Sequence, residues 1–497
     1  TGIPMDKKVN ALINKYTDNE LLLDKLVVNS FVRHQNLDVH KGYLNQFVAE
    51  EKDGLEQDIT LLSSKCTLED VISIFELAIP QTEKTTNGAV YTPKYIRDYI
   101  VSHVFPSVRK PLTECLCADI SCGCGAFLFT LADYIHKETG MSFAEIYHNL
   151  YGIDISEISI RRAKILLALV ALAHGEIVEE NCFNLFKGDS LTFNFWQMPG
   201  VRKNYGIDVI VGNPPYVRSK HIDPITKKNL SRWSTSHIGN ADLYIPFFEI
   251  GASLLCETGI LGYITVNTFF KSVNARQLRN YLSKGTLSLR IINFGEQLVF
   301  KKKLAYTCLA FLSKSPCNSL LYAKANIADV QNDVKIPFGE IEYTMLDNHR
   351  CWNLNQNEVL QNIRRIETTG DPLGDKYVIK NGIATLANDV FIFRPVRSDN
   401  MYFYLIKEGK EYPIEKGICR DIIKPNILKT EEEIPEKEEK IISPYDSEHN
   451  LIEENFFLQE YPLAYRYLQT CRKILDARDK GEGDYGAWYA FGRTQAI

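Results

Sequence analysis

Four consecutive residues, Asn213, Pro214, Pro215 and Tyr216, could position a weakly nucleophilic amine. Two prolines fix the backbone φ angle and remove two amide donors, which gives a rigid segment whose carbonyls accept hydrogen bonds. The exocyclic amine of adenine is a poor nucleophile, because its lone pair is delocalised into the ring. The side-chain oxygen of Asn213 and the carbonyl of Pro214 could each accept one of its N–H groups, while Tyr216 stacks on the base. The motif predicts methylation by positioning and hydrogen bonding, with no covalent intermediate.

A glycine-containing loop within residues 119–128 (DISCGCGAFL) predicts a ligand site. An apolar strand leads into this loop and a helix follows at once. The loop should therefore lie at the carboxyl end of the strand, where ligands bind in parallel sheets. Gly123 and Gly125 lack Cβ, so the backbone can turn sharply and approach a ligand closely. A tight turn without any ligand is the alternative for a glycine pair taken alone.

Three acidic residues end three successive predicted strands: Asp119, Asp154 and Asp189. A carboxylate in the position of Asp154 can accept both ribose hydroxyls of a nucleoside, and Asp189 could accept from an adenine amino group. A dinucleotide site would have a third glycine three residues after Gly125, where this sequence has Leu128. The pattern favours a nucleoside ligand without a pyrophosphate, such as S-adenosylmethionine.

A mostly parallel sheet is needed to bring these groups together. Apolar runs predict strands over residues 114–120, 150–155, 182–187, 207–212, 259–266, 288–294 and 305–312. Helical stretches separate most of them, as in residues 126–137, 157–174 and 244–256. This alternation predicts an α/β fold, a Rossmann-like, doubly wound mixed sheet with helices on both faces. No long helix separates the last two strands, so we expect them to form an antiparallel pair at one end of the sheet.

Changes in hydrophobic periodicity and composition divide the 497 residues into three regions. We expect a helical N-terminal region over residues 5–85, the α/β domain over 86–325 and a mixed α+β domain over 326–497. An aromatic, glycine-containing run over residues 485–492 lies close to Ile497. We therefore expect the last domain to be cut short.

The formal net charge of −5 argues against a generally basic nucleic-acid coat protein. Basic residues nevertheless gather directly after the proline tetrapeptide, where they could contact nucleic-acid phosphates: Arg218, Lys220, Lys227, Lys228 and Arg232. No run of about 18 apolar residues and no signal peptide is found, so we expect a cytoplasmic protein without a membrane span.

Four cysteines in the pattern C-x-C-x4-C-x-C (residues 115–124) raise the question of a zinc site. Structural zinc sites usually use C-x2–4-C knuckles separated by longer loops. One pair here falls in the predicted strand and the other in the glycine loop. We therefore predict that these thiols pack in the core, and we predict no metal site.

Together these motifs resemble the S-adenosylmethionine-dependent adenine-N6 DNA methyltransferases of bacterial restriction–modification systems. Their order, with cofactor motifs first and target recognition at the C-terminus, is that of the gamma class. Residues 89–100 resemble the motif that opens the cofactor pocket. The resemblance implies cofactor-binding roles for Thr92, Asp119, Ser121, Gly123, Gly125, Asp154 and Asp189. It also implies catalytic roles for Asn213, Pro214, Pro215 and Tyr216, and contact of Tyr216 and Phe300 with the target base.

The activity implied by the resemblance is methyl transfer to the N6 amine of an adenine flipped out of duplex DNA, which protects host DNA. Residues 326–497 would then form the target-recognition domain, and residues 218–232 would contact the DNA. Residues 5–85 are too few for the N-terminal endonuclease of fused family members. We therefore expect modification without cleavage in this nucleoid-associated chain, with a separate restriction endonuclease or specificity subunit as a further partner.

Two alternatives fit parts of the pattern. The tetrapeptide also suits the amine of an RNA adenine or the amide of a protein glutamine, although such enzymes are usually shorter and lack a large C-terminal domain. An inactive subunit that binds cofactor and recognises DNA is the alternative from a different class, and the intact tetrapeptide argues against it.

Overall fold

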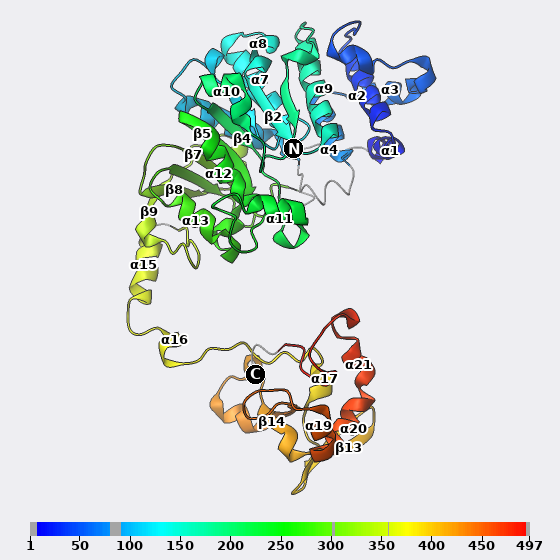
Figure 1. Ribbon diagram of the computed structural model, residues 1–497, viewed down its shortest axis with the longest axis vertical. Coiled ribbons are helices and arrows are strands. Elements are labelled where there is room, and N and C mark those ends of the chain that lie inside the picture. The colour runs from blue at the N-terminus through cyan, green and yellow to red at the C-terminus, as the bar shows by residue number, and fades with distance from the viewer. Residues whose placement is uncertain (1–6, 80–90, 301–303, 356, 494–497) are drawn as a thin grey trace. The chain divides into compact units, whose positions relative to one another are not determined.

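The computed structural model describes residues 7–79, 91–300, 304–355 and 357–493. The chain divides into two compact units, Thr1–Glu367 and Thr368–Ile497 (Figure 1). The first unit contains a nine-stranded sheet of order β3-β2-β1-β4-β5-β7-β6-β8-β9. The second contains two three-stranded sheets and several short helices.

The central strands of the large sheet are parallel. β1 (Cys117–Asp119) pairs with both β2 (Leu150–Asp154) and β4 (Ile207–Gly212). β2 pairs in turn with β3 (Asn184–Lys187), and β4 pairs with β5 (Leu255–Val266). The chain builds the sheet from β1 to β3 in one direction and then continues from β4 on the other side of β1. The strand order therefore reverses between β1 and β4, where open α/β sheets bind their ligands.

The other end of the sheet is mixed. β7 (Thr307–Ser313) runs antiparallel to both β5 and β6 (Ser288–Asn293), which confirms the predicted antiparallel pair. Two strands that were not predicted, β8 (Ser319–Lys324) and β9 (Gly339–Glu342), extend the sheet beyond β6. The boundary predicted between residues 325 and 326 therefore falls inside the first unit, and the structure divides the chain after Glu367 instead. Weak periodicity in these short strands made them resemble the start of a new region.

Helices cover both faces of the sheet, which confirms the predicted doubly wound α/β fold (Figure 1). One face packs against α6 (Lys94–Val104), α7 (Ala126–Thr139), α8 (Phe143–His148) and α9 (Glu157–Ala173). The other packs against α10 (Pro199–Lys203), α11 (Pro224–Leu230), α12 (Ile245–Leu254) and α13 (Arg276–Leu282). In β4, Val209 and Val211 contribute to the first core and Ile210 to the second, because side chains alternate along a strand.

The N-terminal region is helical in its described part, whereas residues 5–6 and 80–85 lie outside the described residues. Its helices are α1 (Lys7–Lys15), α2 (Glu20–His34), α3 (Glu56–Ser63) and α4 (Leu68–Leu77). Both α2 and α4 contact α9. The junction contains a fully buried ion pair, in which Arg162 Nε donates to Asp24 Oδ1 at 2.9 Å. Arg162 also pairs with Glu20, and Arg161 Nε donates to Asp24 Oδ2 at 2.6 Å.

The second unit has its own mixed α+β core. One sheet contains β10 (Ile392–Phe393), β15 (Glu439–Ile442) and β14 (Cys419–Ile422), and the other contains β11 (Arg397–Ser398), β12 (Tyr402–Lys407) and β13 (Lys410–Glu415). The longest helices described in this unit are α19 (Glu454–Glu460) and α20 (Pro462–Thr470). The buried guanidinium of Arg478 donates to the carbonyls of Thr385, Trp488 and Ala490 and so joins both ends of the unit. Within the described ranges of the whole chain, no helix is both long and apolar enough to cross a membrane.

We expect Asp24→Ala to lower the free energy of unfolding of the first unit by about 3–5 kcal/mol, because it removes a carboxylate partner from a fully buried guanidinium. Chemical denaturation followed by circular dichroism measures this change. Glu56→Ala is the control, since Glu56 pairs with Arg33 at an exposed site and should contribute less than about 1 kcal/mol. Equal losses in the two variants would contradict the role assigned to the buried pair.

Candidate active site

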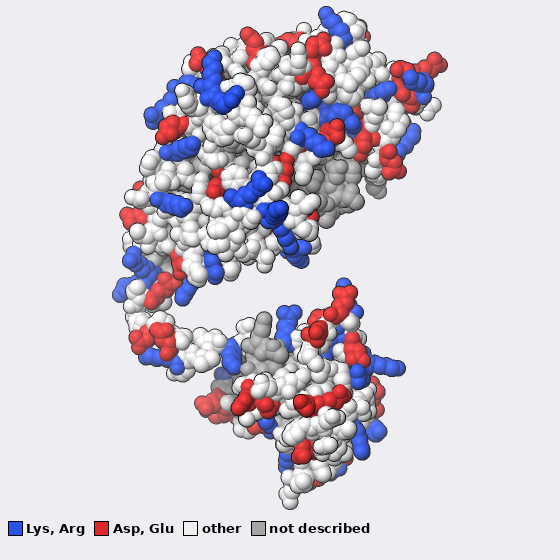
Figure 2. Space-filling view, viewed as in Figure 1, with Lys and Arg blue, Asp and Glu red and all other residues white. Residues whose placement is uncertain are grey.

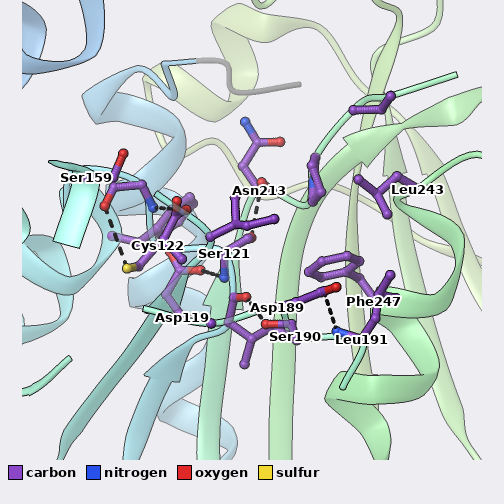
Figure 3. Close-up of a pocket in the computed structure, with 18 of the residues that line it drawn as sticks. Asp119, Ser121, Cys122, Ser159, Asp189, Ser190, Leu191, Asn213, Leu243 and Phe247 are labelled. Atoms are coloured by element: carbon purple, nitrogen blue, oxygen red, sulfur yellow. Dashed lines mark hydrogen bonds between the residues drawn. The ribbon is translucent and has the colours of Figure 1, made fainter. Parts of the chain in front are cut away.

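A cavity of about 150 Å³ lies at the carboxyl ends of the parallel strands, where the strand order reverses (Figure 3). Eight of the residues predicted from the sequence line it: Thr92, Asp119, Ser121, Gly123, Asp154, Asp189, Asn213 and Pro215. The structure thus brings together the glycine loop, the three acids and part of the proline tetrapeptide. Four other predicted residues, Gly125, Pro214, Tyr216 and Phe300, are not among the described residues of its lining.

The two glycines of the loop have different roles. Both have left-handed backbone angles, with φ of +51° at Gly123 and +91° at Gly125, which side chains with a Cβ rarely adopt. The Gly123 N–H donates to Asp154 Oδ2 at 3.0 Å. Gly125 caps the start of α7, and a Cβ there would lie 3.0 Å from Ala163 Cβ on α9. Gly123 therefore shapes the cavity wall, while Gly125 allows α7 and α9 to pack closely.

Asp119 is a nearly fully buried carboxyl group at the end of β1, with 2% of its surface exposed. Burial, together with the smaller effect of the nearby carboxylates of Asp154 and Glu76, raises the pKa of Asp119 to about 8. Hydrogen bonding from Ser121 opposes this shift, mainly through the Ser121 N–H, which donates to Asp119 Oδ1 at 2.9 Å. A Cβ at Gly212 would lie 2.7 Å from the same oxygen, so the end of β4 must be a glycine here.

Backbone N–H groups hold the other two acids. Asp154 Oδ1 accepts the Ser156 N–H at 2.9 Å while its other oxygen accepts from Gly123, which orients the carboxylate at the end of β2. Asp189 Oδ1 accepts the Leu191 N–H at 2.9 Å. Asp189 Oδ2 accepts from Asn229 Nδ2 at 3.2 Å, so Asp189 also ties the loop after β3 to α11.

The proline tetrapeptide continues directly from β4. Asn213 Nδ2 donates to Thr92 Oγ1 at 3.0 Å, and the Ser121 hydroxyl donates to the Asn213 carbonyl at 3.4 Å. These contacts orient the Asn213 amide through its nitrogen and join the tetrapeptide to the glycine loop. The Tyr216 hydroxyl donates to the Ile264 carbonyl on β5 at 3.4 Å. The ring centroid of the buried Phe300 lies 6.1 Å from that of Tyr216, at an interplanar angle of 59°.

Several lining residues were not predicted from the sequence: Glu76, Ile79, Ile155, Leu191 and Phe247. Ile155 directly follows Asp154, so an apolar residue next to the acid at the end of β2 was a usable signal. Phe247 belongs to α12, whose apolar residues resemble ordinary core positions. Glu76 and Ile79 come from the N-terminal helical region, and no local pattern connects them with the glycine loop.

The predicted basic residues are exposed at the surface: Arg218, Lys220, Lys227, Lys228 and Arg232. Lys227 and Lys228 lie on α11, and Lys and Arg side chains gather over this helix on the face shown in Figure 2. Asp223 and Thr226, at the start of the same helix, line the cavity. The segment of residues 218–232 therefore carries the exposed basic residues and also contributes to the cavity wall.

The four cysteines of the C-x-C-x4-C-x-C pattern are all buried. Burial raises the pKa of each of these thiols, so each is a protonated, apolar packing group at neutral pH. Within the part of the chain that the structure describes, no three His, Cys, Asp or Glu side chains gather as a metal site would require.

The fold and the position of the cavity are those of an α/β protein with a ligand site at its topological switch point. This fold is shared with the solved structure of the Type IIL restriction-modification enzyme MmeI in complex with DNA. That likeness has a TM-score of 0.56 and 11% identity over 94% of this chain and 68% of that chain. The DrdV–DNA complex matches with a TM-score of 0.52 and 14% identity, over 76% of this chain and 45% of that chain.

Sequence comparison extends the likeness. Residues 148–300 match the family described as "Eco57I restriction-modification methylase". The Type II restriction enzyme and methyltransferase RM.Eco57I of Escherichia coli is 26% identical and covers 84% of this chain, but the chain spans only 48% of that protein. The Type II methyltransferase M.BstVI of Geobacillus stearothermophilus is 24% identical, with 83% of this chain and 75% of that protein covered. The chain is thus similar to methyltransferases of restriction–modification systems, which confirms the resemblance of its motifs to that broad class of enzymes.

We expect the affinity of the cavity for a cationic nucleoside such as S-adenosylmethionine to rise with pH and to level off above about pH 8. Below the pKa of Asp119 the free protein holds a neutral carboxyl, and a bound cation favours its ionised form, so binding releases a proton. The gain is about tenfold per pH unit at most, because one proton is released. Isothermal titration between pH 6 and pH 9 measures it.

The control for this pH profile is Asp119→Asn, which keeps an oxygen for the Ser121 N–H but removes the titrating group. Both proteins meet the same ligand, so titration of the ligand itself cancels between them. If affinity changes with pH in the same way in the wild type and in Asp119→Asn, the ionisation of Asp119 is not coupled to ligand binding.

Proposed function

We propose that this chain is a site-specific DNA methyltransferase that transfers a methyl group from S-adenosylmethionine to the N6 amine of adenine. The observation that carries the proposal is the shared cavity. Asn213 and Pro215 of the amine-binding tetrapeptide line the same space as Asp154 and Asp189, the acids suited to a nucleoside. Similarity to methyltransferases of restriction–modification systems supports the same activity.

The donor set of the cavity fits S-adenosylmethionine. Asp154 ends β2 in the position suited to ribose hydroxyls, and Ile155 and Phe247 supply apolar surface. The lining contains acidic residues, and its described part contains no Lys, Arg or His, which suits a ligand with net positive charge. When bound, this cofactor supplies an electrophilic methyl group on its sulfonium.

The chain's own residues then act on the amine. The Asn213 side-chain oxygen and the Pro214 carbonyl accept the two N–H groups of the adenine N6, and its lone pair turns toward the methyl group. Thr92 supports this arrangement because it accepts from the Asn213 amide nitrogen, which leaves the oxygen end directed to the substrate. Tyr216 and Phe300 pack against the base. The nitrogen forms its bond to carbon as the carbon–sulfur bond breaks, and the amine then loses one proton to solvent.

Duplex DNA reaches this site by base flipping, since a stacked adenine cannot enter the cavity. The exposed basic residues on and beside α11 contact phosphates, and the second unit reads the recognition sequence. The cognate nuclease or specificity subunit of the restriction–modification system is a separate partner in this proposal.

We expect Asn213→Ala to reduce methyl transfer by about 100- to 1000-fold, because the amine loses one of its two acceptors. The affinity for cofactor should change little, since Asp154 and Asp189, the acids proposed to bind the nucleoside, are held by backbone N–H groups of other residues. Labelled cofactor, mixed-sequence duplex DNA and mass spectrometry of the digested bases measure the rate and identify the methylated base. RNA and glutamine-containing peptides are offered in parallel.

The control variant for this test is Asn280→Ala, at an exposed position on α13. It should keep wild-type activity. Methylation of cytosine in place of adenine, or an Asn213→Ala variant with unreduced transfer, would overturn the proposed reaction.

We expect the double variant Lys227→Ala/Lys228→Ala to weaken DNA binding equally on all sequences. The slope of the logarithm of affinity against the logarithm of salt concentration should fall by about one per lost phosphate contact. Fluorescence anisotropy at several salt concentrations measures both effects. Lys65→Ala/Lys335→Ala removes the same charge at exposed positions outside α11 and should keep the wild-type slope. An identical slope in both double variants would exclude α11 from the DNA contact.

A further inference from the structure

Glu76 brings a carboxylate from the N-terminal helical region into the candidate cofactor cavity. It lies near the end of α4, is half-buried and lines the cavity with Asp119 and Gly123. Glu76 Oε1 accepts the Cys124 N–H at 3.4 Å. A Cβ built on Gly123 would lie 3.3 Å from the same oxygen. The carboxylate thus borders the glycine loop directly, although it belongs to a region without the motifs of the α/β domain.

The buried junction between the N-terminal helices and α9 holds Glu76 in this place. Arg162 Nη1 donates to the carbonyl of Phe75, the residue before Glu76, at 3.4 Å, and the guanidinium lies 5.4 Å from the centroid of the Phe75 ring. The same guanidinium pairs with the buried Asp24. The end of α4 is therefore fixed to α9, the helix that also packs against Gly125. A carboxylate held this way is preorganised for a ligand.

The position of Glu76 along the cavity identifies the part of a ligand that it meets. Asp154 and Asp189 lie at the ends of β2 and β3, which is the nucleoside side. Glu76 contacts the loop between β1 and α7, where the remainder of a nucleoside-containing ligand must extend. Asp119 is the other carboxyl group at that end, but it is buried beneath the loop and accepts from Ser121. Glu76 is the more accessible of the two.

We propose that Glu76 binds the α-ammonium group of the methionine moiety of S-adenosylmethionine, so that the N-terminal helical region completes the cofactor site. This assignment rests on the proposed function of the cavity. An ammonium supplies three N–H donors and a full positive charge, and a half-buried carboxylate forms a charge-assisted hydrogen bond with it. The N-terminal helices are therefore part of the binding site, and a domain cut to begin at α6 would lack this contact.

Three ligands with the same nucleoside test the assignment. Isothermal titration compares S-adenosylmethionine with 5′-methylthioadenosine, a neutral thioether that lacks both the ammonium and the sulfonium charge. S-adenosylhomocysteine, a neutral thioether that keeps the ammonium, separates these two charges, and Glu76→Gln should weaken its binding as it weakens that of S-adenosylmethionine. We expect Glu76→Gln to weaken the binding of S-adenosylmethionine by at least about tenfold, as for loss of a charge-assisted hydrogen bond. The binding of methylthioadenosine should be unchanged. Gln retains an oxygen for the Cys124 N–H, and unchanged methylthioadenosine binding shows that the cavity is intact. Glu51→Gln, at an exposed position of the same region, is the matched control and should bind both ligands as the wild type does.

The outcomes separate this assignment from the proposed function. If the wild type and Glu76→Gln bind S-adenosylmethionine equally well, the ammonium contact is wrong but the proposed cofactor site is still supported. If Glu76→Gln weakens the binding of S-adenosylmethionine and of methylthioadenosine equally, the ammonium contact is also wrong, because the substitution has then changed the structure of the cavity. Wild-type protein that binds neither ligand overturns the proposed cofactor site, and the role of Glu76 with it.

Discussion

The parallel pairing of β1 with both β2 and β4 is the constraint on which the rest of this structure depends. Parallel neighbours end at the same edge of a sheet, so the glycine loop, Asp154 and Asn213 meet although the chain separates them widely. The connections between such strands must cross the faces of the sheet, which places helices on both sides. The pairing also limits side chains at the edge, because the carboxyl of Asp119 occupies the space that a Cβ at Gly212 would need.

The N-terminal helices belong to the same physical unit as the sheet. A fully buried ion pair between Asp24 and Arg162 crosses the junction, and breaking such a pair leaves an uncompensated charge in a desolvated site. This cost favours one fixed arrangement of α2 and α4 on α9. The end of α4 then forms part of the cavity wall, so an element without any catalytic motif contributes to the candidate cofactor site.

The distribution of charge matters more here than its sum. A net charge of −5 describes a mildly acidic protein on average. Locally, however, the cavity wall is acidic and the segment around α11 is basic and exposed. Burying the carboxyl of Asp119 beside two other carboxylates is unfavourable for its ionised form, which is why its pKa is raised. A cationic ligand offsets that cost, whereas the basic residues remain in water and are suited to polyanionic phosphates.

Local patterns in the sequence determined the α/β class, the central strands, the glycine loop and the proline tetrapeptide, because strand and turn preferences act over a few residues. The strands β8 and β9 were missed because they are short, and because the place of β8 in the sheet depends on pairing with β6 and that of β9 on pairing with β8. Only the tertiary structure placed Glu76 beside the glycine loop, and only it showed that Gly125 serves helix packing. Such contacts depend on how separate elements pack, and packing across long chain separations leaves no periodic signal in the residues themselves.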